Sequence, residues 1–292
     1  MVLSSGGARG LAHVGVIEEL ERRGYEISEI AGCSAGALVG GMYAAGKMPE
    51  FKDWICNLDR VDVFSLMDFT FSSRGFIKGE KVYNALKKVV QDCQIEDLPI
   101  RFSCNAVEVN SGKEYIFKKG SLYKAIRASG SIPSVFLPAK IDQHHFIDGG
   151  VLNPVPFSLL SVPSKDLLVL VDVYGLEIEF SPPPQKDETG KSFITLPNWV
   201  KEYQSKMKQF FPEEKKAESK LAYSSLDLVT RSFDLLQDRF CELLLEKHPV
   251  DVKIKVSRKQ AGTLEFHRSA EMIEIGRLKA KEALDQLENG NQ

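Results

Sequence analysis

The chain has 292 residues, 43% of them apolar and 27% charged, and a net charge of −2, which is a globular composition without the basic character of a nucleic-acid-binding protein. No apolar run reaches the ~20 residues of a membrane-spanning helix. The five cysteines include no Cys-x-x-Cys pair, so neither a disulfide framework nor a zinc site is indicated, and we expect a cytoplasmic protein.

The first part of the chain alternates short strands with helices. Residues 2–5 predict a strand, the glycine-rich residues 6–10 a turn, and residues 11–23 an amphipathic helix. Residues 28–31 predict a second strand, and the small apolar residues 35–46 a second helix. This order predicts a βαβα unit with a parallel sheet and helices on both of its faces.

Between the second strand and the second helix lies Gly32-Cys33-Ser34-Ala35-Gly36, the Gly-x-Ser-x-Gly pattern of a nucleophile elbow. A serine that attacks a carbonyl must stand clear of the backbone on a sharp turn, and Gly32 and Gly36 allow such a turn. Ser34 is therefore a candidate nucleophile, and Cys33 is expected to point inward. The alternative is a glycine-rich helix start without a reactive serine.

The glycine loop before the first helix has several uses in proteins. A dinucleotide site would need an acidic residue at the end of the second strand, and a Walker loop would need Gly-Lys-Ser/Thr, and neither is present. The better hypothesis is an oxyanion hole formed by the backbone N–H groups of Gly6, Gly7, Ala8 and Arg9. The Arg9 side chain would either hold a phosphate head group or fix the loop.

The middle of the chain predicts further helices and two hairpins. Helices are expected at 48–58, 80–91 and 121–129, the last of them ended by Gly130; strands at 100–107, 114–117, 138–141 and 145–147; and irregular or loop structure at 61–73 and 74–79. The second hairpin leads into Asp148-Gly149-Gly150, where little side-chain bulk competes with the carboxylate. Asp148 is therefore a candidate partner for Ser34, and the alternative is a plain Asp-Gly turn.

The tail predicts a buried parallel strand at 166–174, a strand at 250–256 and a closing helix at 267–287. Residues 178–197 are rich in proline and charge, and an aromatic stripe at 197–211 predicts either a core helix or a lid that meets a lipid surface. A long helix is expected at 216–247. We therefore predict a single domain, 1–292, with a helical insert or lid at 178–247.

The sequence resembles the patatin-like phospholipase family in its bacterial branch. The resemblance rests on residues 6–15, 32–37, 124–133 and 148–156. It implies an α/β fold with a mainly parallel sheet in three α/β/α layers, and a catalytic dyad. The implied roles are nucleophile for Ser34, base for Asp148, oxyanion hole for Gly6, Gly7, Ala8 and Arg9, and motif support for Gly10, Gly32, Gly36, Gly149 and Gly150. One departure is Ser5, which stands where the family usually has a third glycine.

A Ser-His-Asp triad is the rival to this dyad. In that arrangement the histidine follows the acid, which leaves His248 and His267, and neither lies in a loop suited to the role. His144 and His145 precede Asp148 on a hairpin and are not clearly aimed at the same point. His13 is expected to pack or hydrogen bond beneath the glycine loop, so the dyad is favoured.

Together these features predict a serine acyl hydrolase that cleaves lipid carboxylic esters through an acyl-enzyme, either phospholipase A-like or a broad lipase/esterase. It would need no cofactor and no metal, bind fatty-acyl esters and no nucleic acid, and work in the cytoplasm or at a membrane surface. Two alternatives remain. One is a soluble short-chain carboxylesterase or thioesterase, and the other is a catalytically silent module that binds an anion.

Overall fold

The computed structural model describes residues 1–72, 75–161, 166–175 and 225–290. Its strands are β1 (Val2–Leu3), β2 (Glu29–Cys33), β3 (Phe69–Ser72), β4 (Gly75–Ile77), β5 (Arg101–Glu108), β6 (Lys113–Phe117), β7 (Ala139–Ile141), β8 (His144–Asp148), β9 (Val169–Gly175) and β10 (Val252–Ser257). Its α-helices are α1 (Ala12–Arg22), α2 (Ala35–Ala44), α3 (Met48–Cys56), α4 (Arg60–Leu66), α5 (Glu80–Val89), α6 (Leu122–Ser129), α8 (Ser225–Lys247) and α9 (Ser269–Gly290).

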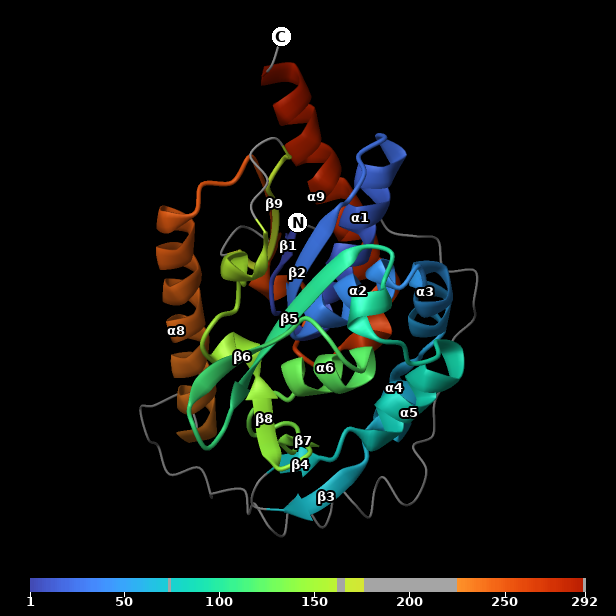
Figure 1. Ribbon diagram of the computed structural model, residues 1–292, viewed down its shortest axis with the longest axis vertical. Coiled ribbons are helices and arrows are strands. Elements are labelled where there is room, and N and C mark those ends of the chain that lie inside the picture. The colour runs from blue at the N-terminus through green and yellow to red at the C-terminus, as the bar shows by residue number, and fades with distance from the viewer. Residues whose placement is uncertain (73–74, 162–165, 176–224, 291–292) are drawn as a thin grey trace, which may run out of the picture. The chain divides into compact units, whose positions relative to one another are not determined.

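A mixed, mostly parallel sheet organises the described residues. Its strands follow the order β10-β9-β1-β2-β5-β8-β7, and β6 pairs with β5 outside this path (Figure 1). The neighbours from β10 to β5 run parallel, whereas β6, β7 and β8 form antiparallel pairs. The predicted inner parallel strand is β9, which lies between β10 and β1 and is buried along its length.

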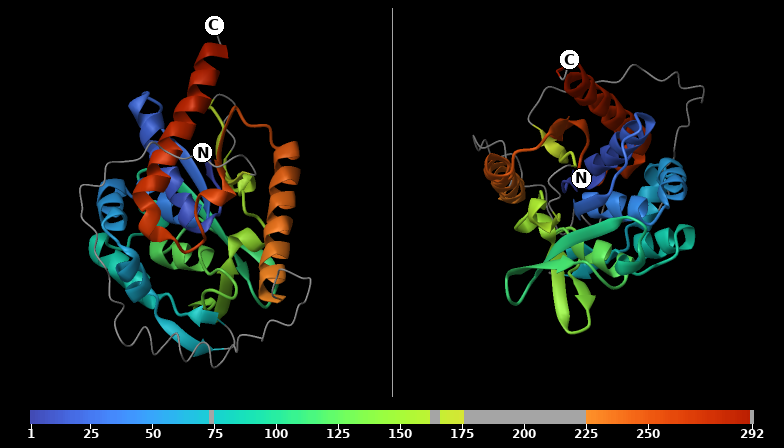
Figure 2. Two further views of the ribbon diagram at one scale, coloured as in Figure 1. Left: turned by 180° about the vertical axis from the view of Figure 1, so that it is seen from behind. Right: turned by 45° about the horizontal axis from the view of Figure 1, so that its top comes forward.

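Apolar side chains leave the sheet on both faces, because successive residues of a strand point in opposite directions. Leu3 and Val171 belong to the larger apolar cluster, which includes residues of α1, α2 and α9. Val2 and Leu170 belong to a smaller cluster that includes Cys241 of α8. Figure 2 shows α1 and α9 side by side over one face of the sheet. The predicted α/β/α fold class is therefore confirmed.

The structure differs from the predictions mainly between residues 59 and 77. A helix, α4, and the hairpin β3–β4 occupy a stretch that was expected to be irregular. The helix starts at a capping box, in which Asp59 accepts from the N–H groups of Val61 and Asp62 while Asp62 accepts from Asp59 N–H. The predicted turn at residues 6–10 is also replaced, by a short 3₁₀ helix, η1 (Gly7–Leu11).

The predicted insert falls largely on residues 176–224, which lie outside the described ranges, as does the aromatic stripe at 197–211. Backbone contacts divide the chain into two units, residues 1–182 with 236–292 and residues 183–235, and all sites described below belong to the first. Within the ranges described above, no helix combines the length and apolar character needed to cross a bilayer.

Candidate functional site

Ser34 stands on a strained turn between β2 and α2. Its backbone has φ 53° and ψ −115°, a region that residues other than glycine rarely adopt. A Cβ atom at Gly36 would lie 2.2 Å from the carbonyl oxygen of Leu3, so only glycine lets α2 start this close to β1. Ser34 is 4% exposed, and its N–H group donates to Oγ of Ser129 over 2.8 Å.

The sheet register brings Ser34 and Asp148 to the same level. Cys33 pairs with Asn105 across β2 and β5, so the following residue, Ser34, lies level with Ala106. Ala106 in turn pairs with Asp148, the last residue of β8. The two predicted site residues are more than a hundred positions apart in the chain, and the single strand β5 joins them.

Asp148 is held in a buried position that favours its neutral form. Its Oδ1 atom accepts from Gly150 N–H over 2.7 Å and lies 3.9 Å from Sγ of Cys33. Burial raises the pKa of Asp148 from 3.8 to about 6, and the nearby hydroxyl of Ser34 is foremost among the groups that oppose this rise. Oδ2, the second carboxylate oxygen of Asp148, is buried and has no hydrogen-bond partner among the described residues.

The end of α6 holds both residues through the short segment from Ser129 to Ser131. Ser129 Oγ accepts from Ser34 N–H, and the carbonyl oxygen of Ser131 accepts from Asp148 N–H over 2.9 Å. The sequence analysis missed these roles, although the segment belongs to one of the matching stretches. Gln237 was also missed, and its Nε2 donates to the carbonyl oxygen of Gly150 over 3.0 Å.

The glycine loop is anchored to the C-terminal part of the chain. Ala8 N–H donates to the carbonyl oxygen of Thr263 over 2.9 Å, so this predicted oxyanion donor is already engaged. The Arg9 side chain is buried and its Nη1 donates to the carbonyl oxygen of Ala261 over 2.9 Å. Of the two roles considered for Arg9, the structure therefore supports fixing the loop.

Two other N–H groups remain for an anion. Gly7 and Ala35 are the first residues of η1 and α2, so their N–H groups have no acceptor within their own helices. No carbonyl oxygen of a described turn or loop accepts from either group. Both residues line the same cleft as Ser34.

No histidine bridges Ser34 and Asp148, although all five histidines lie within the described ranges. His13 is buried and its Nε2 is 2.9 Å from the carbonyl oxygen of Ser4, as expected for a residue beneath the loop. Burial lowers the pKa of His13 to about 4, so its ring is neutral at physiological pH. His248 stacks on Phe157, and His267 accepts from Arg60.

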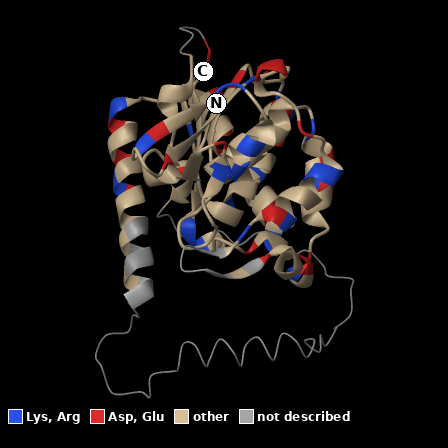
Figure 3. Cartoon of the chain, turned by 60° about the horizontal axis from the view of Figure 1, so that its bottom comes forward, with Lys and Arg blue, Asp and Glu red and all other residues tan. Residues whose placement is uncertain are grey.

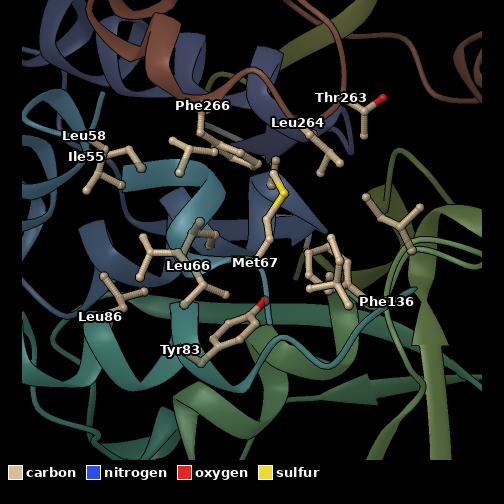
Figure 4. Close-up of a pocket in the computed structure, with 18 of the residues that line it drawn as sticks. Ile55, Leu58, Leu66, Met67, Tyr83, Leu86, Phe136, Thr263, Leu264 and Phe266 are labelled. Carbon is tan, nitrogen blue, oxygen red and sulfur yellow. The ribbon is translucent and has the colours of Figure 1, made fainter. Parts of the chain in front are cut away.

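An apolar cleft opens beside Ser34. Figure 4 shows its side chains pointing toward one another from α3, α4, α5 and the segments around Phe136 and Thr263–Phe266. Apart from Ser34, its side chains are almost all aliphatic or aromatic, including Leu38, Leu58, Met67, Val82, Leu86, Ile132 and Phe136. The cleft can therefore hold a long hydrocarbon chain with one end at the serine.

Within the described part of the chain, no group of three or more His, Cys, Asp or Glu side chains is arranged to hold a metal ion. Cys33 is fully buried, and burial raises the pKa of its thiol well above the usual value. The prediction that Cys33 points inward is confirmed. A thiol in this state is a poor nucleophile, whereas Ser34 lines the cleft.

Comparison with known proteins gives four similarities. The family model described as "Patatin-like phospholipase" matches residues 1–161. A protein of Mycobacterium bovis, named as an uncharacterized NTE family protein, is 31% identical over an aligned length of 329 positions. The alignment covers 99% of this chain and 91% of that protein. Lysophospholipase nte1 of Emericella nidulans is 27% identical over 295 residues, which cover 99% of this chain and 18% of that protein. Among solved structures, VipD from Legionella pneumophila has a TM-score of 0.47 and 13% identity, with coverage of 97% of this chain and 66% of that one.

Proposed function

Because the chain belongs to the patatin-like phospholipase family, it is a hydrolase of lipid ester bonds, and we propose that Ser34 and Asp148 perform the reaction as a two-residue dyad. The observation that carries this proposal is a serine on an elbow, level with a buried aspartate, at one end of an apolar cleft. No histidine competes for the role of base among the described contacts of either residue.

In the proposed mechanism, Ser34 Oγ attacks the ester carbonyl carbon and its proton passes to Oδ2 of Asp148. That oxygen has no hydrogen-bond partner among the described residues, so it is open to the proton. Catalytic hydrogen bonds often tighten only when substrate binds. The raised pKa makes Asp148 a stronger base than an exposed aspartate. The protonated carboxyl then protonates the departing alcohol, and water releases the fatty acid from Ser34.

The developing oxyanion would be stabilised by the N–H groups of Gly7 and Ala35, and the family resemblance adds Gly6, which is not among the residues that line the cleft, as a further candidate. Gly7 and Ala35 line the cleft, and each opens a helix, where the helix dipole favours negative charge. The predicted donor Ala8 is left out because its N–H group is bound to Thr263. The residue after the nucleophile, here Ala35, commonly supplies such a donor in serine hydrolases.

The substrate class follows from the cleft. Its long apolar wall favours a fatty-acyl ester over a short-chain ester, because each buried methylene contributes about 0.8 kcal/mol. The name of the Emericella nidulans relative, lysophospholipase nte1, favours a lysophospholipid. We therefore propose a lysophospholipase or phospholipase A-like activity.

A panel of p-nitrophenyl esters of increasing chain length, with lysophospholipids, tests this function. The ratio kcat/KM is expected to rise with chain length. Leu38→Trp and Val82→Trp each place an indole ring in the cleft. In both variants kcat/KM for long-chain esters should fall about tenfold or more, while hydrolysis of the acetate ester persists. Melting curves identify any variant that is unfolded. A wild-type preference for acetate would instead indicate a short-chain esterase.

The role of Ser129 gives a further prediction. Ser129→Ala removes the acceptor for Ser34 N–H and leaves that buried group unsatisfied, so kcat should fall about tenfold or more while KM changes little. Ser131→Ala is the matched control, because the carbonyl oxygen that binds Asp148 N–H remains. The rate at which a fluorophosphonate labels Ser34 should fall with kcat. An equal loss in both variants would contradict a specific role for Ser129.

The pH dependence follows from the base. Asp148 must be ionised to accept a proton, and its pKa is raised to about 6, so kcat/KM should be low near pH 4, rise through about pH 6 and level off above it. An unperturbed aspartate would place the rise near its ordinary pKa of 3.8. The measurement is the pH profile of kcat/KM with a neutral ester, and a profile already flat at pH 5 would contradict the raised pKa.

A further inference from the structure

A second concave site lies beside the apolar cleft, and it is lined by residues of α5, α6 and the segment from Leu137 to Ile141. Five basic side chains line it and only one carboxylate, Glu80; the basic residues are Lys78, Lys87, Lys124, Arg127 and Lys140. All four lysines are exposed to solvent.

The positive charge of this basic groove is not neutralised within the described part of the chain. None of its five basic side chains has a carboxylate oxygen within 4.0 Å there, whereas other basic residues, such as Arg23 and Arg277, are paired with glutamates. Arg127 instead donates to Ser131 Oγ and to the carbonyl oxygens of Lys78 and Leu137. Figure 3 shows Lys and Arg interspersed with Asp and Glu on several of the helices in view.

The basic groove shares a wall with the apolar cleft. Tyr83 of α5 lines both sites, and the Arg127 guanidinium lies over the Tyr83 ring at 5.7 Å. An apolar site and a basic site are therefore adjacent, as the acyl chains and the phosphate groups of lipids are at the surface of a bilayer. Arg127 is occupied by three hydrogen bonds, so the exposed lysines are the groups that can reach a ligand.

We infer that the basic groove binds the phosphate groups of anionic lipid head groups and so holds the cleft against an anionic membrane. The inference rests on the proposed function, because it assigns the cleft to lipid. Each lysine near an anionic surface strengthens binding about fivefold, and this attraction falls as salt rises. A groove beside an apolar cleft fits lipid phosphates better than a nucleic acid, which would need a longer basic surface.

The test measures binding of Ser34→Ala protein to vesicles, so that turnover does not enter. Cosedimentation should be strong with vesicles that contain phosphatidylglycerol, weak with phosphatidylcholine alone, and lower at high salt. The double substitution Lys124→Glu/Lys140→Glu should weaken binding at least tenfold. Lys118→Glu/Lys119→Glu makes the same change of net charge at exposed residues outside the groove and should stay within about twofold.

Equal binding by both double variants would overturn the inference. The inference would also be overturned if Lys124→Glu/Lys140→Glu bound vesicles as wild type does but lost binding to glycerol phosphate or polyglutamate. In that case the groove would serve a soluble phosphate or an acidic protein. A second assay separates the proposed hydrolase activity from the proposed role of the groove. It measures hydrolysis of a monomeric p-nitrophenyl ester by wild type and by the two double variants, all of which keep Ser34. If that hydrolysis is absent in wild type, the proposed function fails, whereas groove-dependent vesicle binding would still stand.

Discussion

Ser34→Ala is expected to lower kcat/KM for fatty-acyl esters by about a thousandfold or more while the protein remains folded. The substitution removes the proposed nucleophile, and the loss of a nucleophile is among the largest effects of a single side chain in serine hydrolases. Its structural cost is small, because no described hydrogen bond uses the Ser34 hydroxyl and the N–H bond to Ser129 remains. The measurements are steady-state kinetics and the melting temperature.

Covalent labelling makes this prediction specific to one atom. A fluorophosphonate should add its mass to the peptide that contains Ser34 in the wild type, and not in Ser34→Ala. Cys33→Ala is the control for the neighbouring nucleophile and should keep both labelling and most activity, since Cys33 is fully buried. Label on any other residue, or activity that survives in Ser34→Ala, would remove the basis for the proposed mechanism.

Asp148→Asn is expected to lower kcat by about a thousandfold or more, because an amide cannot accept the Ser34 proton. The substitution keeps the shape of the side chain and can keep the bond from Gly150 N–H. Single alanine substitutions of His144, His145, His248 and His267 should leave most activity in place, since none contacts Ser34 or Asp148 through a described interaction. A folded histidine variant without activity would replace the dyad with a triad.

Asp148→Asn should also show that the ionised Asp148 carboxylate lowers the free energy of unfolding. The pKa of Asp148 is raised from 3.8 to about 6, so the folded state binds the proton more tightly than the unfolded state. Stability therefore falls between these two pH values, and above them the penalty is about 3 kcal/mol. Asp148→Asn should melt several degrees above the wild type at pH 8 and close to it near pH 4. A lower melting temperature at pH 8 would contradict this account.

The sequence predicted those parts of the molecule that local patterns encode. The elbow, the strands and helices of the sheet, and the inward position of Cys33 depend on spacing within a few residues. The α4 helix was missed because its signal is the Asp59–Asp62 capping box rather than apolar periodicity. The part of the prediction at 176–224 falls outside the described residues.

The parts of the site that depend on long-range contacts could not be predicted. Nothing near residue 8 indicates that its N–H group will meet the carbonyl oxygen of Thr263, far along the chain. Serines are common, so the sequence does not distinguish Ser129 from other serines. Its role follows only from the structure, in which its Oγ accepts from Ser34 N–H. The cleft likewise combines side chains from α2 to the loop before α9, which no single stretch of sequence brings together.

The distribution of the site along the chain limits how far the protein can be shortened. Residues 1–161 contain both Ser34 and Asp148, but β1 is flanked on one side by β9, and Thr263 and Ala261 bind Ala8 and Arg9. A fragment that stopped at residue 161 would hold the reactive groups without the neighbours that orient them, and it would leave β1 as an unprotected edge prone to aggregation. The smallest active unit therefore extends well past the stretch that carries the family signature.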